Sequence, residues 1–400
     1  MAIVAQLVRA SDCGPEGRGF DSRQSPHLKN KVAHELLFCF SAKFSCYLAP
    51  NIYTLADLSF SSVMQTLISK PSPELYRQAK NLIQSWELVA FPTETIYGLG
   101  ANALDSDAVQ KIFTVKGRPS SNPLIVHIGE KSQIADLAIV ENSFQQQIID
   151  KLFPGPVTLL LKKKPGIPEV VTQNPFVGIR MPSNQIANDF LKAVALPIAA
   201  PSANISGKPS PTSAPMVMDN VGGKIPLIID GGDSNYGIES TVIRVDEENN
   251  QGKIWILRPG FITKEDLEAF FEGQPVSVEY TSKDKNLSPG TRFRHYSIPG
   301  KITIIDHKTE LPTSFDVPTA VIATTERFER ENFHSLDPHT PFLTKLQRGS
   351  ESNLASCAHT LFQLYHDCEK AGIQTVFIQR LTENGLGFAI MNRVKRSAEN

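Results

Sequence analysis

The spacing of hydrophobic and polar positions predicts alternating strands and helices from residue 72 onward. Ser72 and Pro73 are typical of a helix start, and apolar residues then recur at helical spacing as far as Trp86. Short apolar runs, typical of buried strands, follow at 88–91, 124–128, 157–162, 177–181, 197–200, 227–229, 241–245 and 254–257. Helical spacing between these runs predicts helices at 105–116, 144–152, 185–194, 212–219 and 263–271. The alternation predicts an α/β domain with a large mixed sheet.

A second, smaller domain is predicted after a stretch with little periodicity. Residues 272–299 have the irregular pattern of a linker. Beyond them, apolar runs at 301–306, 320–324 and 376–379 predict buried parallel strands, with a long helix near 354–371. This pattern predicts a small Rossmann-like unit. No GxGxxG motif follows its first strand, so a dinucleotide site there has little support.

The first 63 residues have a different character from the rest. The segments VAQLVRA at 4–10 and GFDS at 19–22 can be encoded by the consensus arms of a tRNA gene, so this stretch resembles a tRNA gene translated as protein. We therefore expect 1–63 to be a non-native or unstructured extension and the start to lie near Met64; the other interpretation is a disordered natural extension. The expected parts are an extension (1–63), a first domain (64–273), a linker (274–299) and a second domain (300–400).

Composition excludes several classes of protein. The chain has 40 basic and 41 acidic residues, so it lacks the excess positive charge of a general nucleic-acid binder. A local basic pocket is still compatible with this balance. Five cysteines without a CxxC pair favour a reducing compartment, the cytoplasm, and none lies between residues 47 and 356 to act as a nucleophile there. No apolar run is long enough to cross a bilayer, so no membrane partner is expected. P-loop, HExxH and GxSxG motifs are absent.

Candidate chemistry lies in turns beside the predicted strands, where α/β proteins build their sites. Lys116 and Arg118 flank Gly117, and two cations at this spacing fit either a triphosphate clamp or a solvated basic helix end. His127 and Arg180 interrupt apolar strands. A buried arginine needs an anionic partner, for which Glu239 and a ligand carboxylate are the candidates.

A resemblance becomes specific when the turn motifs are taken in order. FPTETIYGLGANA, KGRPSSNPLIVHI, FPGPVTLLL, GIRMP, PIAAPSAN, GIEST and LRPG resemble the YrdC-like family, in particular its threonylcarbamoyl-AMP synthases. LSPGTRFRHY at 287–296 and GLGFAIMNR at 385–393 resemble the longer, two-domain form. Ser297-Ile298-Pro299 departs from the Ala-Pro that often follows the His-Tyr pair in the family, which bears on the local path of the linker.

The resemblance implies both a fold and an activity. The fold is a YrdC-like domain with a large twisted mixed sheet, followed by a linker and a small Rossmann-like α/β domain. The activity is that of a nucleotidyltransferase, which makes L-threonylcarbamoyladenylate from L-threonine, bicarbonate or CO2, and ATP with Mg2+, and releases pyrophosphate. The product would serve a downstream threonylcarbamoyl-transferase complex that modifies tRNA to N6-threonylcarbamoyladenosine at position 37.

Site residues are implied by motif position. Thr95, His127, Arg180 and Ser240 would surround threonine, with Arg180 on its carboxylate. Lys116 and Arg118 would be catalytic. The ATP site would comprise Lys116, Arg118, Asn122, Ala200, Ser202, Asn204, Ser210, Arg258, His295 and Tyr296. No protein-bound metal is implied, and the linker would close over the nucleotide as a lid.

Two other functions compete with this hypothesis. One is a YrdC-like module that binds structured RNA without catalysis, and it would have no need for His127, Arg180 and Ser240 together. The other is carbamoyl transfer from carbamoyl phosphate, as in hydrogenase-maturation proteins that contain a related domain. Those proteins carry zinc-finger-like cysteines and further domains, which are absent here.

Overall fold

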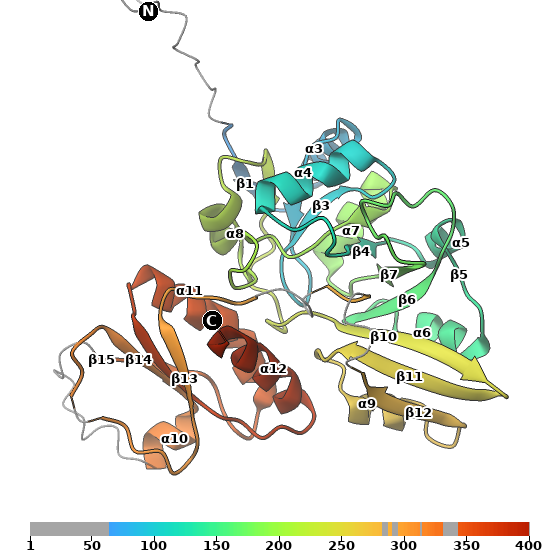
Figure 1. Cartoon of the computed structure of the whole chain (residues 1–400). Helices are drawn as coiled ribbons and strands as arrows, with labels where there is room; N and C mark the ends of the chain where they lie inside the picture. The colour runs from blue at the N-terminus through green and yellow to red at the C-terminus, as the bar shows by residue number, and fades with distance from the viewer. Residues whose placement is uncertain (1–63, 282–286, 290–294, 313, 331–342, 400) are drawn as a thin grey trace, which may run out of the picture. The chain divides into compact units, whose positions relative to one another are not determined.

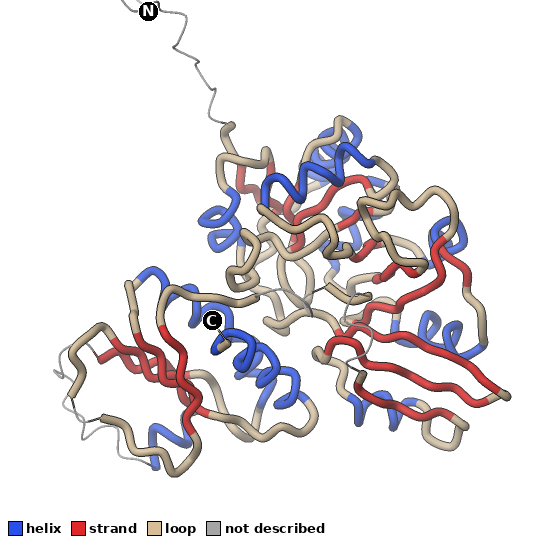
Figure 2. The backbone as a smooth tube through the Cα atoms, in the orientation of Figure 1, coloured by secondary structure: helices blue, strands red, loops and turns tan. Residues whose placement is uncertain are grey.

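The computed structural model describes residues 64–281, 287–289, 295–312, 314–330 and 343–399 (Figure 1). The predicted extension, residues 1–63, lies outside the described residues. Val63–Asn400 cluster into one compact unit by their contacts. Within the described part the chain forms two α/β domains, each with its own sheet, whose strands are drawn in red in Figure 2.

The first domain is built on a 12-stranded mixed sheet. Its strands are β1 (Leu67–Ser69), β2 (Val89–Phe91), β3 (Gly98–Asn102), β4 (Ile125–His127), β5 (Ala138–Ile139), β6 (Val157–Lys163), β7 (Phe176–Arg180), β8 (Ile198–Ala199), β9 (Leu227–Ile229), β10 (Thr241–Glu248), β11 (Gln251–Arg258) and β12 (Val276–Tyr280). Their order is β1-β9-β2-β3-β8-β4-β7-β6-β10-β11-β12, with β5 paired to β6. The α/β fold with a large mixed sheet is therefore confirmed.

Helices cover this sheet on both faces. They are α3 (Pro73–Gln84), α4 (Ser106–Lys116), α5 (Ile134–Leu137), α6 (Ser143–Leu152), α7 (Gln185–Val194), α8 (Ala214–Val221) and α9 (Lys264–Phe270), with a 3-10 turn at Lys131–Gln133. The apolar sides of α3 and α7 pack together in one buried cluster with β2, β8 and β9. A larger cluster on the other side includes α4, α6, α8 and α9. Burial of these apolar faces is the main stabilising term of the domain.

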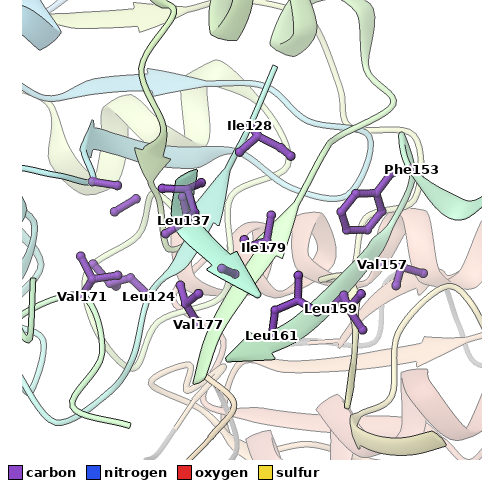
Figure 3. Close-up of a cluster of buried hydrophobic side chains, with 14 of the residues drawn as sticks. Leu124, Ile128, Leu137, Phe153, Val157, Leu159, Leu161, Val171, Val177 and Ile179 are labelled. Carbon is purple, nitrogen blue, oxygen red and sulfur yellow. The ribbon is translucent and has the colours of Figure 1, made fainter. Parts of the chain in front are cut away.

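The central strands form the densest part of the larger cluster. Figure 3 shows Val157, Leu159 and Leu161 of β6 beside Val177 and Ile179 of β7. All five side chains have no exposed surface. A rigid centre of this kind fixes the ends of β4 and β7, which carry His127 and Arg180.

The second domain has a four-stranded parallel sheet in the order β13-β16-β14-β15. Its elements are β13 (Lys301–Ile305), β14 (Thr319–Ala323), α10 (Thr325–Arg330), β15 (Leu343–Gln347), α11 (Leu354–Lys370), β16 (Thr375–Gln379) and α12 (Leu386–Ala398). Helices α11 and α12 share a buried cluster with Ala320 and Ile322 of β14. The alternate residues Val321 and Ala323 contact Phe328 of α10 instead, so helices lie against both faces, as in Rossmann-like domains.

Five strands were not predicted: β1, β3, β5, β12 and β15. β3 is buried but contains two glycines, and β12 and β15 show a different reason. Residues 276–280 lie in the stretch expected to be an irregular linker, but they form β12, which pairs in parallel with β11. β15, on the edge of the second sheet, was also missed. Both strands mix polar and apolar residues because each lies at an edge and is only partly buried.

Candidate functional site

Neighbouring strands end at one pocket of the first domain. His127 ends β4 and pairs in register with Arg180, which ends β7. Gly98, at the start of β3, forms a bridge with Ser202, just after β8. The predicted site residues that line the pocket are Arg118, His127, Arg180, Ala200, Ser202, Ser210, Ser240, Arg258, His295 and Tyr296. Motifs far apart in the sequence therefore meet here.

The remaining predicted residues lie behind the pocket wall. Thr95, Lys116, Asn122 and Asn204 are buried but do not line the cavity. Thr95 contacts a residue that does, whereas the Asn204 side chain holds its own loop. Thr95 Oγ1 accepts a 2.9 Å hydrogen bond from Arg180 Nη1, and Asn204 Nδ2 donates to the carbonyls of Ile205 and Lys208 at 2.8 and 2.7 Å.

Arg180 forms a buried ion pair with Glu94. The Nη2–Oε1 distance is 2.7 Å, and both side chains are only 4% exposed. Of the two anionic partners expected for Arg180, Glu239 is wrong, because its carboxylate pairs with Arg393. Glu94 was missed, although it stands between two threonines in the first motif. A buried charge with a partner is far less costly than one without.

Lys116 is placed by the end of helix α4. Asp105 caps the start of this helix, and its carboxylate accepts 2.9 Å hydrogen bonds from the amides of Asp107 and Ala108. The helix ends at Gly117, whose φ of 60° is the left-handed conformation that glycine adopts without strain. Lys116 Nζ then donates to the carbonyls of Ser202 and Asn204. Lys116 therefore ties helix α4 to the loop after β8.

Burial changes the protonation equilibria of both cations of this motif. Removal from water, together with the nearby charge of Arg118, holds the pKa of Lys116 well below its usual range. Burial, together with the charge of Arg258, lowers the pKa of Arg118 to about 9. Arg118 still lines the pocket, and its Nη2 donates to the carbonyl of Pro123 at 3.0 Å. It remains a cation at neutral pH.

Ser240, Arg258 and Glu239 form the opposite wall. Arg258 Nη2 donates to the carbonyl and to Oγ of Ser240 at 3.0 and 3.1 Å, and its Nη1 donates to the carbonyl of Pro289 at 3.1 Å. Glu239 Oε1 accepts a 2.6 Å hydrogen bond from Ser210 Oγ. The two turns can approach this closely because of Gly260, where an added Cβ would lie 2.3 Å from the amide nitrogen of Thr241.

Both pocket histidines are neutral at physiological pH. Burial and the charge of Arg180 lower the pKa of His127 to about 3, and burial and the charge of Arg118 lower the pKa of His295 to about 3. His127 Nδ1 and His295 Nε2 are buried and have no hydrogen-bond partner among the described residues. Asn122 Nδ2 and Asn204 Oδ1 share this property. Unsatisfied buried polar atoms around one pocket favour a polar ligand there.

The charges of the lining favour an anionic ligand. Three guanidinium groups face the pocket, from Arg118, Arg180 and Arg258, against the single carboxylate of Glu239. The cavity has about 60 Å³, room for about four water molecules. A ligand as large as a nucleotide therefore requires the wall to open.

Tyr296 and His295 close one side of this cavity. The ring of Tyr296 is stacked on Phe362 of α11, with 5.0 Å between centroids, and it is 3% exposed. Tyr296 has a φ of 64°, which is unusual for a bulky residue. The residue is therefore held in this conformation by its contacts rather than by local preference.

Neither a metal-binding cluster nor a membrane-spanning helix occurs in the part of the chain that the structure describes. The described ranges contain no group of three or more His, Cys, Asp or Glu side chains that could hold a metal ion. In these ranges, too, no helix combines the length and the apolar character needed to cross a membrane.

The fold and the pocket define a YrdC-like α/β domain joined to a Rossmann-like domain. The family model described as "Telomere recombination" matches residues 81–260, and the model described as "Threonylcarbamoyl-AMP synthase, C-terminal domain" matches residues 262–399. The threonylcarbamoyl-AMP synthase of Pyrococcus abyssi is 36% identical over 335 residues, which cover 80% of this chain and 93% of the relative. That of Bacillus subtilis is 36% identical over 340 residues, which cover 83% and 94%.

Solved structures agree with these matches. A P. abyssi Sua5 variant with one histidine and one tyrosine replaced by alanine superposes with a TM-score of 0.71 at 32% identity, covering 84% of this chain and 97% of that one. P. abyssi Sua5 complexed with L-threonine superposes with a TM-score of 0.67 at 32% identity and the same coverage. The chain belongs to the threonylcarbamoyl-AMP synthase family.

Proposed function

We propose that this chain synthesises L-threonylcarbamoyladenylate from L-threonine, bicarbonate or CO2, and ATP, and releases pyrophosphate. The observation that carries the proposal is a single pocket lined by Arg118, Arg180 and Arg258 together with neutral His127, in a chain of this family. Such a pocket suits a substrate pair with a carboxylate and a triphosphate. No described feature favours the RNA-binding or carbamoyl phosphate alternatives.

Threonine would bind at the His127–Arg180 end of the pocket. Arg180 would receive the carboxylate, and the buried Glu94 and Thr95 would hold its guanidinium in place. Neutral His127 would contact threonine as an uncharged hydrogen-bonding group and not as a base, because a pKa of about 3 makes the imidazole a poor proton acceptor. Ser240 would complete the amino-acid site, with its hydroxyl positioned by Thr158 at 2.8 Å.

ATP would bind at the Arg118–Arg258 end. Both guanidinium groups line the pocket and offer planar pairs of donors to phosphate oxygens. Lys116 would act by fixing the loop that carries Ser202 and Asn204, and its Nζ would turn to phosphate if that loop moves. Mg2+ would enter with ATP on the phosphate oxygens, which fits a pocket whose nearby carboxylates, Glu94 and Glu239, are both paired with arginines.

The chemistry requires positioning and charge neutralisation rather than a covalent nucleophile. The ammonium group of threonine first loses one proton to solvent. The free amine then bonds to the carbon of CO2 and releases a second proton to solvent, or bonds to the carbon of bicarbonate, whose hydroxide leaves with that proton as water. A carbamate oxygen then attacks the α-phosphorus of ATP in line, and the bond to pyrophosphate breaks. Arginines that surround these oxygens offset the charge that develops on the leaving group.

The linker would act as a lid. The carbamate intermediate is unstable in water, and the pocket closed by Tyr296 leaves space for only a few water molecules. Opening of this wall would admit ATP and release pyrophosphate. The released adenylate would serve a threonylcarbamoyl-transferase complex acting on tRNA.

The test uses purified protein beginning at Met64, supplied with ATP, Mg2+, bicarbonate and L-threonine. Pyrophosphate release and threonylcarbamoyl-AMP are followed by enzymatic assay and mass spectrometry, with reactions lacking threonine or bicarbonate as controls. We expect product that depends on both. Folded, ATP-binding protein that makes no product would overturn the proposal.

A further inference from the structure

We propose that Arg393, on helix α12 of the second domain, is a positioning residue that keeps Glu239 away from Arg258, so that Arg258 remains available to the anionic substrate. This inference rests on the proposed function and adds a role for the second domain. Arg393 ends the GLGFAIMNR motif, for which packing and contact between the domains were expected.

Arg393 reaches the back of the active-site pocket. Its side chain is fully buried, and its Nε lies 3.1 Å from Glu239 Oε2, forming an ion pair with a carboxylate that is 8% exposed. Its Nη1 donates to the carbonyl of Pro259. One guanidinium group from the second domain therefore holds both turns that form the Ser240–Arg258 wall.

The carboxylate of Glu239 has two arginines near it and is bound to only one. Oε2 pairs with Arg393, and Oε1 accepts the hydroxyl of Ser210. Within the described residues neither oxygen accepts a hydrogen bond from Arg258, which donates instead to Ser240 and Pro289. Burial works to raise the pKa of Glu239, but the charges of Arg393 and then Arg258 outweigh it and hold that pKa below its usual value. Glu239 is therefore an anion within reach of the charge of Arg258.

Without Arg393, the Glu239 carboxylate would pair with a different cation. A buried carboxylate without its partner is costly, and the positive charge of Arg258 also acts on Glu239. If Glu239 pairs with Arg258, the phosphate groups of ATP must compete with a fixed carboxylate for the same guanidinium. ATP binding should then weaken, while threonine binding at Arg180 should change little.

Further contacts fix the same wall against the second domain. An added Cβ on Gly237, whose φ is 72°, would lie 2.5 Å from the carbonyl oxygen of Ala358 on α11. The carbonyl of Asn235 is 3.2 Å from His359 Nδ1 on the same helix. The backbone beside Glu239 contacts α11 directly. This contact defines the distance that the Arg393 side chain must bridge to reach the Glu239 carboxylate.

The experiment compares Arg393→Ala with Glu369→Gln as a matched control. Glu369 also forms an ion pair between the domains, with Lys208 at 2.6 Å, but it does not line the pocket. For each variant, initial rates give KM for ATP, KM for threonine and kcat. Titration with a non-hydrolysable ATP analogue gives a Kd that is independent of turnover.

We expect Arg393→Ala to raise KM and Kd for the nucleotide about tenfold or more, since one lost charge interaction of this type is worth at least one decade. Glu369→Gln should leave both within about twofold of the wild type. The decisive variant is Arg393→Ala combined with Glu239→Gln, because the amide can still accept the Ser210 hydroxyl but carries no charge to attract Arg258. This double variant should recover nucleotide affinity to within about threefold of the wild type.

The possible outcomes are separable. A double variant as weak as Arg393→Ala would show that Arg393 only joins the domains, and unchanged nucleotide affinity in Arg393→Ala would equally overturn the inference. If Arg393→Ala does not fold, Arg393→Lys and the double variant carry the test, because neither leaves a buried carboxylate without compensation. A wild-type protein that makes no threonine-dependent product refutes the proposed function instead, whereas the nucleotide Kd values still judge the role of Arg393.

Discussion

Replacement of Tyr296 by alanine tests whether the linker closes the active site. The tyrosine ring is 3% exposed, is stacked on Phe362 and lines the pocket, so its loss removes core contacts and a pocket wall together. Truncation of a buried aromatic residue typically costs about 3 kcal/mol of folding free energy. The open wall should also admit water and lower the rate of adenylate formation at least about tenfold.

Two further variants separate these effects. Tyr296→Phe keeps the ring and should retain most of the activity and stability. Tyr296→Gly loses the ring as alanine does, but it relieves the left-handed backbone, whose φ is 64°, and should be about 1 kcal/mol more stable than Tyr296→Ala. If lid closure matters, the glycine variant should be as inactive as the alanine variant despite this gain.

The assay is threonine-dependent pyrophosphate release, measured well below the unfolding midpoint of every variant, with thermal unfolding as the stability measure. A Tyr296→Ala protein with wild-type turnover and wild-type KM for ATP would refute the reasoning and remove the linker from the mechanism. Reduced turnover that is restored in full by Tyr296→Gly would attribute the effect to backbone strain instead.

Three other predictions follow from the site. Arg180→Lys should raise KM for threonine about tenfold with little change in KM for ATP, because a single ammonium replaces a planar pair of donors; initial rates test this, and equal increases would contradict it. The pKa of His127 is about 3 in the folded protein against an ordinary 6.5. The folded state therefore keeps its full stability with neutral His127 above about pH 6.5, and it loses stability as the pH falls toward 3, because protonation then favours the unfolded chain. Replacing His127 by Asn should therefore flatten the fall of unfolding free energy in this window by up to about 1.4 kcal/mol per pH unit, as urea titrations would measure, and an unchanged slope would contradict the assignment. Gly260→Ala should cost more than 2 kcal/mol, because the new methyl group would overlap the backbone at Thr241, whereas Gly273→Ala meets no atom within 4 Å and should show only the cost of its left-handed φ; equal losses in urea unfolding would argue against the close approach.

Periodicity predicted most of the buried strands, but it missed the buried strand β3 as well as the edge strands β1, β12 and β15. The strand that ends at His127 and the helix that ends at Lys116 were both predicted within one or two residues, because continuous burial leaves continuous apolar runs. β12 and β15 lie at sheet edges, where solvent permits polar residues and the pattern weakens. Apolar periodicity therefore locates continuous apolar strands more easily than edge strands or a glycine-containing strand such as β3.

The candidate site could be predicted as a set of residues but not as a set of pairs. Arg180 was identified because it interrupts an apolar strand, and Arg258 was identified by its place in the LRPG motif of the resemblance. Nothing in the spacing indicates that Glu94 pairs with Arg180, or that Glu239 pairs with Arg393, which is 154 residues away. Such pairs depend on how the strands are ordered in space, and strand order is not encoded in local patterns. The assignments to threonine and ATP stay predictions.

The contact between Gly237 and helix α11 has a consequence for how the protein loses activity on heating. The residues proposed to perform the chemistry lie in the first domain, but the turn that carries Glu239 rests on the second, with no side chain between the two backbones. Melting of α11 would release this turn while the 12-stranded sheet remains intact. Catalysis therefore requires both domains to remain folded, and a substitution that destabilises only the second domain should lower the temperature at which activity is lost without touching the pocket.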